Sequence, residues 1–358
     1  MSTHRLGNLL AKVHRPGKIP ASEYLDEGEY PVIDQGQLPI AGYTSDHEIV
    51  VRAPLPITIF GDHTRAVKLA KEPFAYGADG TQLLYPNSEH IDPTFFYYAV
   101  KNIDLSNYFY ARHFKFLKEL EVNIPDEKGV QLRIASILSA YDDLIENNRR
   151  RIQLLEQAAR LLYKEWFVHL RFPGHEHTQI IDGVPEGWEK KQVKDLLAKV
   201  KRPGKIQKED YLSDGPIPCV DQSREFIGGY TDQIETMIDE LPMIVFGDHT
   251  RILKFIDFPF ACGADGTQLL AAHDPKISQE FFFFSLDAID LSNYFYARHF
   301  KFLKDQHILR PTDVLIDQFT GVARPILKQV KLLREQNGEL AKARDLLLPK
   351  LMNGEVAV

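Results

Sequence analysis

The chain contains two Asp-His pairs that could do acid–base chemistry, Asp62-His63 and Asp248-His249. A carboxylate that orients a histidine can make it a general base that activates water. The aspartate could instead cap a turn by accepting a backbone hydrogen bond, and the histidine could face a ligand. No nucleophile or paired carboxylate recurs beside both pairs. The sequence therefore favours a structural or ligand-facing role over catalysis.

A second segment interleaves aromatic and cationic side chains. Residues 107–116 read NYFYARHFKF, and the same letters recur at 293–302. On a strand Arg112 shares a face with Tyr108 and Tyr110, and on a helix it aligns with Tyr108 and Lys115. Cations mixed with hydroxyls are typical of phosphate contacts, and arginine also reads guanine edges. A core element whose polar tips reach solvent explains the cations about equally well, and the Phe residues are expected in the core.

Two basic turns extend this candidate surface, Arg15-Pro16-Gly17-Lys18 and its copy Arg202-Pro203-Gly204-Lys205. The net charge of the whole chain is −7, but both turns lie in locally basic stretches. Phosphate contacts depend on the local field, so DNA is not excluded, although a plain solvated loop is equally compatible. The predicted DNA-binding residues are Arg15, Lys18, His63, Arg65, Gln82, Tyr110, Arg112 and Lys115, and in the second copy Arg202, Lys205, His249, Arg251, Gln268, Tyr296, Arg298 and Lys301.

The sequence lacks the common catalytic motifs. It has no G-x-x-x-x-G-K-[ST], G-x-G-x-x-G, H-E-x-x-H or G-x-S-x-G pattern. It also lacks the Asn/Asp-Pro-Pro-aromatic motif of amino-methyltransferases. With only Cys219 and Cys262 a Cys-rich zinc site is excluded, and His175-Glu176-His177 has no further ligands at useful spacing. We therefore predict no catalytic residue and no metal site.

An internal duplication organises the chain. Residues 103–118 are identical to residues 289–304, at an offset of 289 − 103 = 186. Residues 60–65 and 77–84 recur at the same offset, whereas segments near the N-terminus recur at 187, which implies one gap near residue 51. A period this long is a duplicated domain, because solenoid units run only to about 50 residues.

Two further segments have the pattern of long amphipathic helices. Residues 131–167 contain no Gly or Pro, and their apolar residues from Ile145 to Trp166 follow steps of 7, 3, 4, 3 and 4. Residues 325–352 form the second segment, in which Pro325 could sit at a first helical turn or mark a kink. An antiparallel pair needs the shortest connections, with one globular head at each end.

These patterns predict an α+β fold with two duplicated globular domains, separated by two long helices packed as an antiparallel coiled coil. Short apolar runs broken by Gly and Pro indicate strands within each head. The predicted divisions are 1–128 for the first head, 129–172 for the first spacer helix, 173–312 for the linker and second head, and 313–358 for the second spacer helix. No apolar stretch approaches the ~18 residues of a membrane span, and no signal peptide is evident, so a cytoplasmic protein is expected.

The motifs resemble those of the specificity subunits of Type I restriction–modification systems. The matching features are Phe-Gly-Asp-His-Thr-Arg and Gly-Ala-Asp-Gly in each head, IASILSAYDDLIENN at 134–148, ARDLLLPKL at 343–351, and Val-Pro-Glu-Gly-Trp at 184–188. The first head lacks that Pro-Glu-Gly-Trp lead-in, which puts its first strand in question. The resemblance extends over nearly the whole chain.

This resemblance implies two target-recognition domains, each reading one half of a split site in double-stranded DNA. It implies that the helices dock two modification subunits, which bind S-adenosylmethionine and methylate adenine, and that a restriction subunit can join to cut DNA with ATP and Mg²⁺. This chain would bind no cofactor and have no activity of its own. Since the heads share long segments, a near-palindromic site is expected. The alternatives are an Asp-His-dependent nuclease, marked by metal-dependent cutting by the isolated chain, and a coiled-coil scaffold without DNA specificity.

Overall fold

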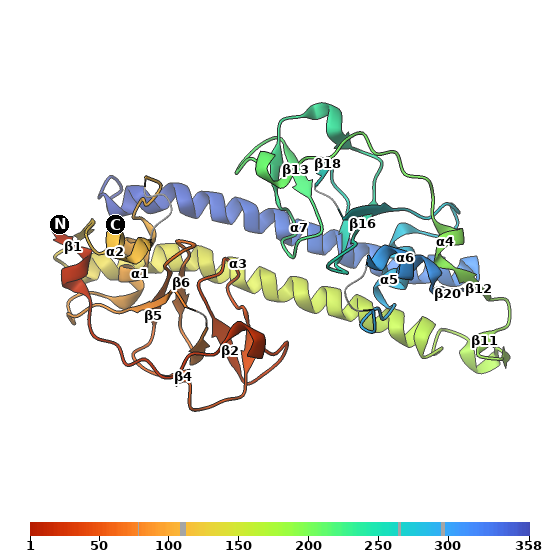
Figure 1. The fold of residues 1–358 in the computed structure, drawn as a ribbon, viewed down its shortest axis with the longest axis horizontal. Coiled ribbons are helices and arrows are strands. Elements are labelled where there is room, and N and C mark those ends of the chain that lie inside the picture. Colours follow the sequence, from red (N-terminus) through yellow and green to blue (C-terminus); the bar gives the residue numbers. More distant parts are fainter. Residues whose placement is uncertain (78, 108–111, 264–265, 295–297) are drawn as a thin grey trace. The chain divides into compact units, whose positions relative to one another are not determined.

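The computed structural model describes residues 1–77, 79–107, 112–263, 266–294 and 298–358, and its contacts divide the chain into two compact units (Figure 1). Unit 1 consists of residues 1–147 and 336–358, and unit 2 of residues 148–335. Each unit therefore combines one head with turns of both long helices. Each is described by itself.

The head of unit 1 is built from short strands and two short helices. Its central strand β5 (Ile57–Gly61) is fully buried, which suits its β-branched and aromatic sequence ITIFG. The strands form a two-stranded, a four-stranded and a three-stranded sheet. In spatial order these are β1 (Ser2–Arg5) and β9 (Glu121–Ile124); β3 (Gly42–Thr44), β2 (Tyr30–Ile33), β7 (Phe74–Tyr76) and β4 (Val50–Val51); and β6 (Val67–Ala70), β5 (Ile57–Gly61) and β8 (Thr81–Leu84), with helices α1 (Pro93–Lys101) and α2 (His113–Leu117).

The head of unit 2 repeats this topology strand for strand, which confirms the duplication. Its first strand β12 pairs with β20 as β1 pairs with β9, so the first head has this strand without the lead-in motif. A two-stranded hairpin, β10 (Ile180–Ile181) with β11 (Val184–Pro185), precedes it. The sheets are β12 (Glu189–Gln192) and β20 (His307–Arg310); β14 (Gly229–Thr231), β13 (Ile217–Val220), β18 (Phe260–Cys262) and β15 (Met237–Ile238); and β17 (Leu253–Ile256), β16 (Met243–Gly247) and β19 (Thr267–Leu270), with helices α4 (Val193–Leu196), α5 (Gln279–Asp287) and α6 (His299–Asp305).

Two long helices follow the heads. Helix α3 spans Lys128–Tyr163 and continues into one π-helical turn at Lys164–Val168, and helix α7 spans Asp313–Met352. Their starts differ by 313 − 128 = 185, so the duplication includes the helices. Helix α7 begins well before Pro325, which therefore lies in its interior. Among the described residues no helix is long and apolar enough to cross a membrane.

The predicted antiparallel pairing is confirmed within each unit. In unit 1, Arg344 of α7 bonds Asp142 of α3, while Asn337 Nδ2 donates to the Ile145 carbonyl oxygen at 3.2 Å. In unit 2, Arg334 Nη2 donates to Glu156 Oε1 at 2.6 Å, and α7 meets later α3 residues through ring contacts near its own start. In both units, residues later in α3 contact residues earlier in α7, so the two helices run antiparallel.

An aromatic helix attaches each head to the long helices. Helix α1 begins at Asp92, whose Oδ1 accepts from the Phe95 amide at 2.8 Å, and Pro93 occupies the first turn. Its buried rings contact α3 and α7 residues in one core. In unit 2, α5 carries four consecutive Phe residues, 281–284, against the same two helices. Burying one such side chain contributes about 1.5–3 kcal/mol, so this packing fixes each head on its helices.

Asp142 is a polar anchor within the packing of unit 1. Its Oδ2 accepts from the Tyr98 hydroxyl at 2.6 Å, and its Oδ1 accepts from Arg344, whose side chain is only 13% exposed. We expect Asp142→Ala to lower the free energy of unfolding by about 2 kcal/mol, because it leaves a buried hydroxyl unpaired and removes a partly buried ion pair. Urea unfolding measures the loss.

The neighbouring residue is a matched control for this prediction. Asp143 pairs with Lys71, and both side chains are at least half exposed. Solvent-exposed ion pairs contribute little to stability, so Asp143→Ala should unfold like the wild type. Equal losses for the two variants would contradict the anchoring role of Asp142.

Candidate nucleic-acid interface

The aspartate of each Asp-His pair joins three of the duplicated segments. Asp62 is buried, its amide donates to the Gly80 carbonyl oxygen at 2.8 Å, and its carbonyl oxygen accepts from the His113 amide at 3.0 Å. Its Oδ1 accepts from the Phe114 amide at 2.7 Å and so caps α2 from a distant strand end. Asp62 therefore has a structural capping role, but it caps a helix 52 residues away and not a turn through its own backbone.

Unit 2 contains the same arrangement around Asp248. Its amide donates to the Gly266 carbonyl oxygen at 2.7 Å, its carbonyl oxygen accepts from the His299 amide at 2.8 Å, and its Oδ1 accepts from the Phe300 amide at 2.8 Å. Both copies thus tie the end of a central strand to the glycine turn and to the start of a short helix. We call each set of these bonds the aspartate clamp.

A glutamine that sequence reasoning missed supports the turn beside each clamp. Gln35 Nε2 donates to the Asp79 carbonyl oxygen at 2.8 Å, and its Oε1 accepts from the His63 amide at 3.2 Å. Gly80 has φ +93°, and a Cβ there would lie 2.6 Å from the Gln35 Oε1, so both the backbone and the space require glycine. In unit 2, Gln222 Oε1 accepts from the His249 amide at 3.1 Å. The Asp-Gln dipeptide at 34–35 and 221–222 was the available signal.

Several predicted DNA-binding residues gather around this turn in unit 1. Lys18 Nζ lies 2.8 Å from Asp79 Oδ1, and Arg15 Nη2 donates to Gln82 Oε1 at 3.1 Å. Lys18 and the positive charge of Arg112 lower the pKa of the fully exposed Asp79 carboxyl, so all three side chains share one neighbourhood. Exposed residues at this surface or on the adjoining α2 are His63, Arg112 and Lys115.

The equivalent residues of unit 2 have matching positions. Arg202 Nη2 donates to Gln268 Oε1 at 2.9 Å, as Arg15 does to Gln82. The side chains of Lys205, His249, Arg298 and Lys301 are exposed. Tyr110 and Tyr296, also predicted to bind DNA, lie outside the described residues.

The predicted pair Arg65 and Arg251 has a more internal position than the other cations. Arg65 Nε donates to Nε2 of the buried His113 at 3.0 Å, and Arg251 Nη1 donates to the Leu291 carbonyl oxygen at 3.1 Å. Both residues have positive φ, 62° and 63°, an uncommon conformation for arginine. These bonds give Arg65 and Arg251 a structural role whether or not they also contact DNA.

The chemistry of the site is that of a polar binding surface. In the part of the chain that the structure describes, no group of three His, Cys, Asp or Glu residues is placed to hold a metal ion. The Asp62 Oδ1 and carbonyl oxygen accept from backbone amides rather than orienting His63. The arrangement offers cations and amide groups around a rigid turn, which suits contacts to phosphate and base edges.

The loop beside each turn differs between the heads but has the same support. Residues 36–39 read GQLP and residues 223–226 read SREF. In unit 1, Lys68 Nζ donates to the carbonyl oxygens of Asp34, at 2.9 Å, and Leu38. In unit 2, Lys254 is only 4% exposed. Its Nζ donates to the carbonyl oxygen of Asp221, at 2.8 Å, and to that of Glu225. An equivalent lysine in each head, buried in unit 2 and partly buried in unit 1, therefore braces a loop whose exposed residues vary.

Burial lowers the pKa of Lys254 to about 8, although Asp221 and Glu225 act in the opposite direction. The unfolded chain holds the same proton up to pH ~10.4, so it binds more protons than the folded chain between these values. Stability conferred by Lys254 should therefore rise with pH across this window. We expect the free energy of unfolding of the wild type, minus that of Lys254→Met, to increase between pH ~8 and ~10 in urea unfolding.

Lys68→Met is the matched variant for this measurement. Burial also lowers the pKa of Lys68, and its side chain is more exposed than that of Lys254, 12% against 4%. The difference between wild type and Lys68→Met should change in the same direction by a smaller amount. A difference that falls with rising pH for Lys254→Met would contradict the depressed pKa.

Comparisons with known proteins agree with the fold and the motifs. Residues 2–157 match the model of the Type I restriction modification DNA specificity domain. The chain is 28% identical to the Type I restriction enzyme MjaIX specificity subunit of Methanocaldococcus jannaschii, over 68% of this chain and 62% of that protein, and so spans under two thirds of that relative. It is 24% identical to the HindI specificity subunit of Haemophilus influenzae, over 68% of this chain and 70% of that one. The S subunit structure from M. genitalium has the same fold, with a TM-score of 0.53, 17% identity, and coverage of 98% of this chain and 96% of that one.

Proposed function

We propose that the chain is a specificity subunit of a Type I restriction–modification system, whose two heads are target-recognition domains for the two halves of a split DNA site. The observation that supports this best is the repetition of one polar surface in both units. Each copy has an aspartate clamp, a glycine turn, a supporting glutamine and exposed cations. Two binding surfaces with the same residues in one chain are what recognition of a DNA site with two related halves requires.

The half-sites should be inverted, because the two long helices exchange roles between the units. The head of unit 1 packs on the first turns of α3 and the last turns of α7. The head of unit 2 packs on the first turns of α7 and the last turns of α3. The two heads therefore use the long helices in opposite order, and we propose that they read inverted half-sites, as two-fold proteins read palindromic DNA.

We further propose that modification subunits, two for the two repeats, dock on the exposed faces of α3 and α7. Large apolar side chains that remain exposed on surface helices often mark protein partners. On α3 these include Leu144, Leu154 and Leu161, each more than half exposed, and on α7 Leu346 is 70% exposed. The partners would hold S-adenosylmethionine and methylate adenine, a restriction subunit would use ATP and Mg²⁺, and this chain would act by recognition alone.

We expect Arg112→Ala, and equally Arg298→Ala, to weaken DNA binding. Both side chains are exposed and immediately precede the short helix that the clamp caps. Loss of a phosphate contact should weaken binding to all sequences and reduce the salt slope by about one, whereas loss of a base contact should cost about 1–3 kcal/mol and relax one position. Fluorescence titrations of the assembled complex at several salt concentrations distinguish the two results.

Lys71→Ala is the control for these variants. The substitution Lys71→Ala also removes an exposed positive charge. Lys71, however, follows β6 at the end of that strand that is remote from the glycine turn, and it pairs with Asp143 of α3. It should leave affinity and salt slope unchanged. An Arg112→Ala complex with unchanged affinity, salt slope and base preference would remove Arg112 from the interface.

The target itself tests the proposed function. Mapping methylated adenines in a genome that carries this system should reveal two inverted, closely related half-sites separated by unread bases. Half-site centres about 10 bp apart would place both on one face of the duplex. We expect one or two bases to differ between the halves where the loops 36–39 and 223–226 differ, since Arg and Glu prefer other base edges than Gln. Halves without inverted similarity would show that residues outside the shared segments determine specificity.

A further inference from the structure

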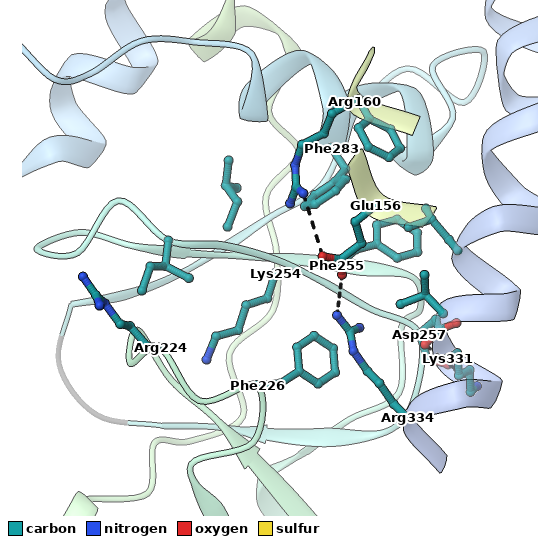
Figure 2. Close-up of a pocket in the computed structure, with 15 residues that line it drawn as sticks. Glu156, Arg160, Arg224, Phe226, Lys254, Phe255, Asp257, Phe283, Lys331 and Arg334 are labelled. Carbon is teal, nitrogen blue, oxygen red and sulfur yellow. Dashed lines mark hydrogen bonds and ion pairs between the residues drawn. The ribbon is translucent and has the colours of Figure 1, made fainter. Parts of the chain in front are cut away.

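One loop of the second head is attached to a long helix. Residues 222–226, here called the second recognition loop, end at Phe226, and the guanidinium carbon of Arg334 on α7 lies 3.7 Å from the centre of the Phe226 ring (Figure 2). The ring also meets Phe258 at a centroid distance of 5.9 Å. Phe226 and Arg334 border a cavity of about 200 Å³ between the loop, the strand β17 and the two helices.

Arg334 is itself held in place by charged neighbours. Its Nη2 donates to Glu156 Oε1 at 2.6 Å, and Arg160 approaches the same carboxylate to 3.8 Å from the other side (Figure 2). Arg160 in turn bonds Asp287 at 2.9 Å. The guanidinium plane on which the Phe226 ring stacks is therefore fixed by α3 and not only by its own side chain. Arginine is suited to this because it can stack and donate in its plane at once.

The other contacts of the second recognition loop leave Arg224 and Glu225, the residues that we expect to face DNA, exposed. The backbone of the loop is braced by Lys254, through the carbonyl oxygens of Asp221 and Glu225. Arg224 and Glu225, which stand between Asp221 and Phe226 in the sequence, are both exposed. Both ends of a short exposed segment are thus restrained, which is the condition for a preorganised contact.

The first head has the brace but lacks the stack. The residue equivalent to Phe226 is Pro39, because 226 − 187 = 39, and it is exposed. Its neighbours Leu38 and Ile40 are 42% and 40% exposed. The lysine contact is common to both heads, whereas the attachment to a long helix is a property of the second loop.

We propose that Arg334 is a positioning residue for DNA recognition by the second head. By stacking on Phe226 it fixes the backbone that presents Arg224 and Glu225, so the second half-site is read more selectively than the first at the bases facing this loop. This inference rests on the proposed function, since it assumes that both heads read DNA. Arg334 acts through the loop and need not touch DNA itself.

Arg334→Lys tests the proposal in the full-length chain assembled with its modification subunits. Lysine keeps the charge beside Glu156 but cannot provide the planar stack. Binding is measured to a DNA library in which each half-site is varied separately. We expect discrimination at one or two positions of the second half-site to fall by ~3- to 10-fold, the range for loss of one cation–π contact. Selectivity in the first half-site and the salt slope should remain those of the wild type, which a general loss of stability would not produce.

Two further variants complete the test. Phe226→Leu fills the same space without a ring and should give the same one-sided loss, so the proposal stays testable if Arg334→Lys does not fold. Arg324→Lys, which alters an α7 arginine paired with Glu280 at 2.6 Å, should keep full selectivity in both halves. Unchanged selectivity in folded Arg334→Lys and Phe226→Leu, or equal losses in both halves, would overturn the proposal. A wild-type complex with no base preference would instead refute the recognition function on which it rests.

Discussion

The aspartate clamp is the interaction on which both heads depend. One buried residue, Asp62 or Asp248, uses its amide, its carbonyl and its carboxylate to join a strand end, a glycine turn and a short helix that are far apart in sequence. A buried carboxylate must have its hydrogen bonds satisfied, so the three segments can hold only one mutual arrangement. The backbone segments that carry the exposed cations are therefore joined through this one residue.

This rigid centre allows the neighbouring loop to vary. Lys68 and Lys254 donate to backbone carbonyl oxygens of the loops and also pair with the carboxylates of Asp34 and Asp221, at 3.8 and 3.9 Å. Since both aspartates lie outside the variable residues, the side chains at 36–39 and 223–226 can change while the brace remains. Backbone contacts carry no information about side-chain identity. A recognition domain needs this combination, because its target changes through a few exposed residues whereas its position on the phosphate backbone must not.

The sequence predicted the duplication, the antiparallel helices and the core role of the aromatic residues, because repeats, periodicity and hydrophobicity are local signals. It offered a cap by Asp62 through its own backbone as one alternative, but not the bond to Phe114, which lies 52 residues away, because no local pattern encodes that distance. The glutamines that support the turns were missed for the same reason. Arg65 was predicted only as a DNA contact, and the sequence did not indicate that its side chain bonds the buried His113.

A duplicated chain differs from a symmetric dimer in that its halves can diverge one residue at a time. The clamp, the brace and the glycine turn are equal in both units, so each head has the same scaffold. The contact between Phe226 and Arg334 belongs to the second head alone. Arg334 lies on a helix that also contributes to the first unit, but its side chain contacts the loop of the second head. It can therefore serve that loop without altering the fold of the first loop. Under the proposed function, this contact provides a way to adjust selectivity in one half of the chain without changing the clamp, the brace or the turn that both heads share.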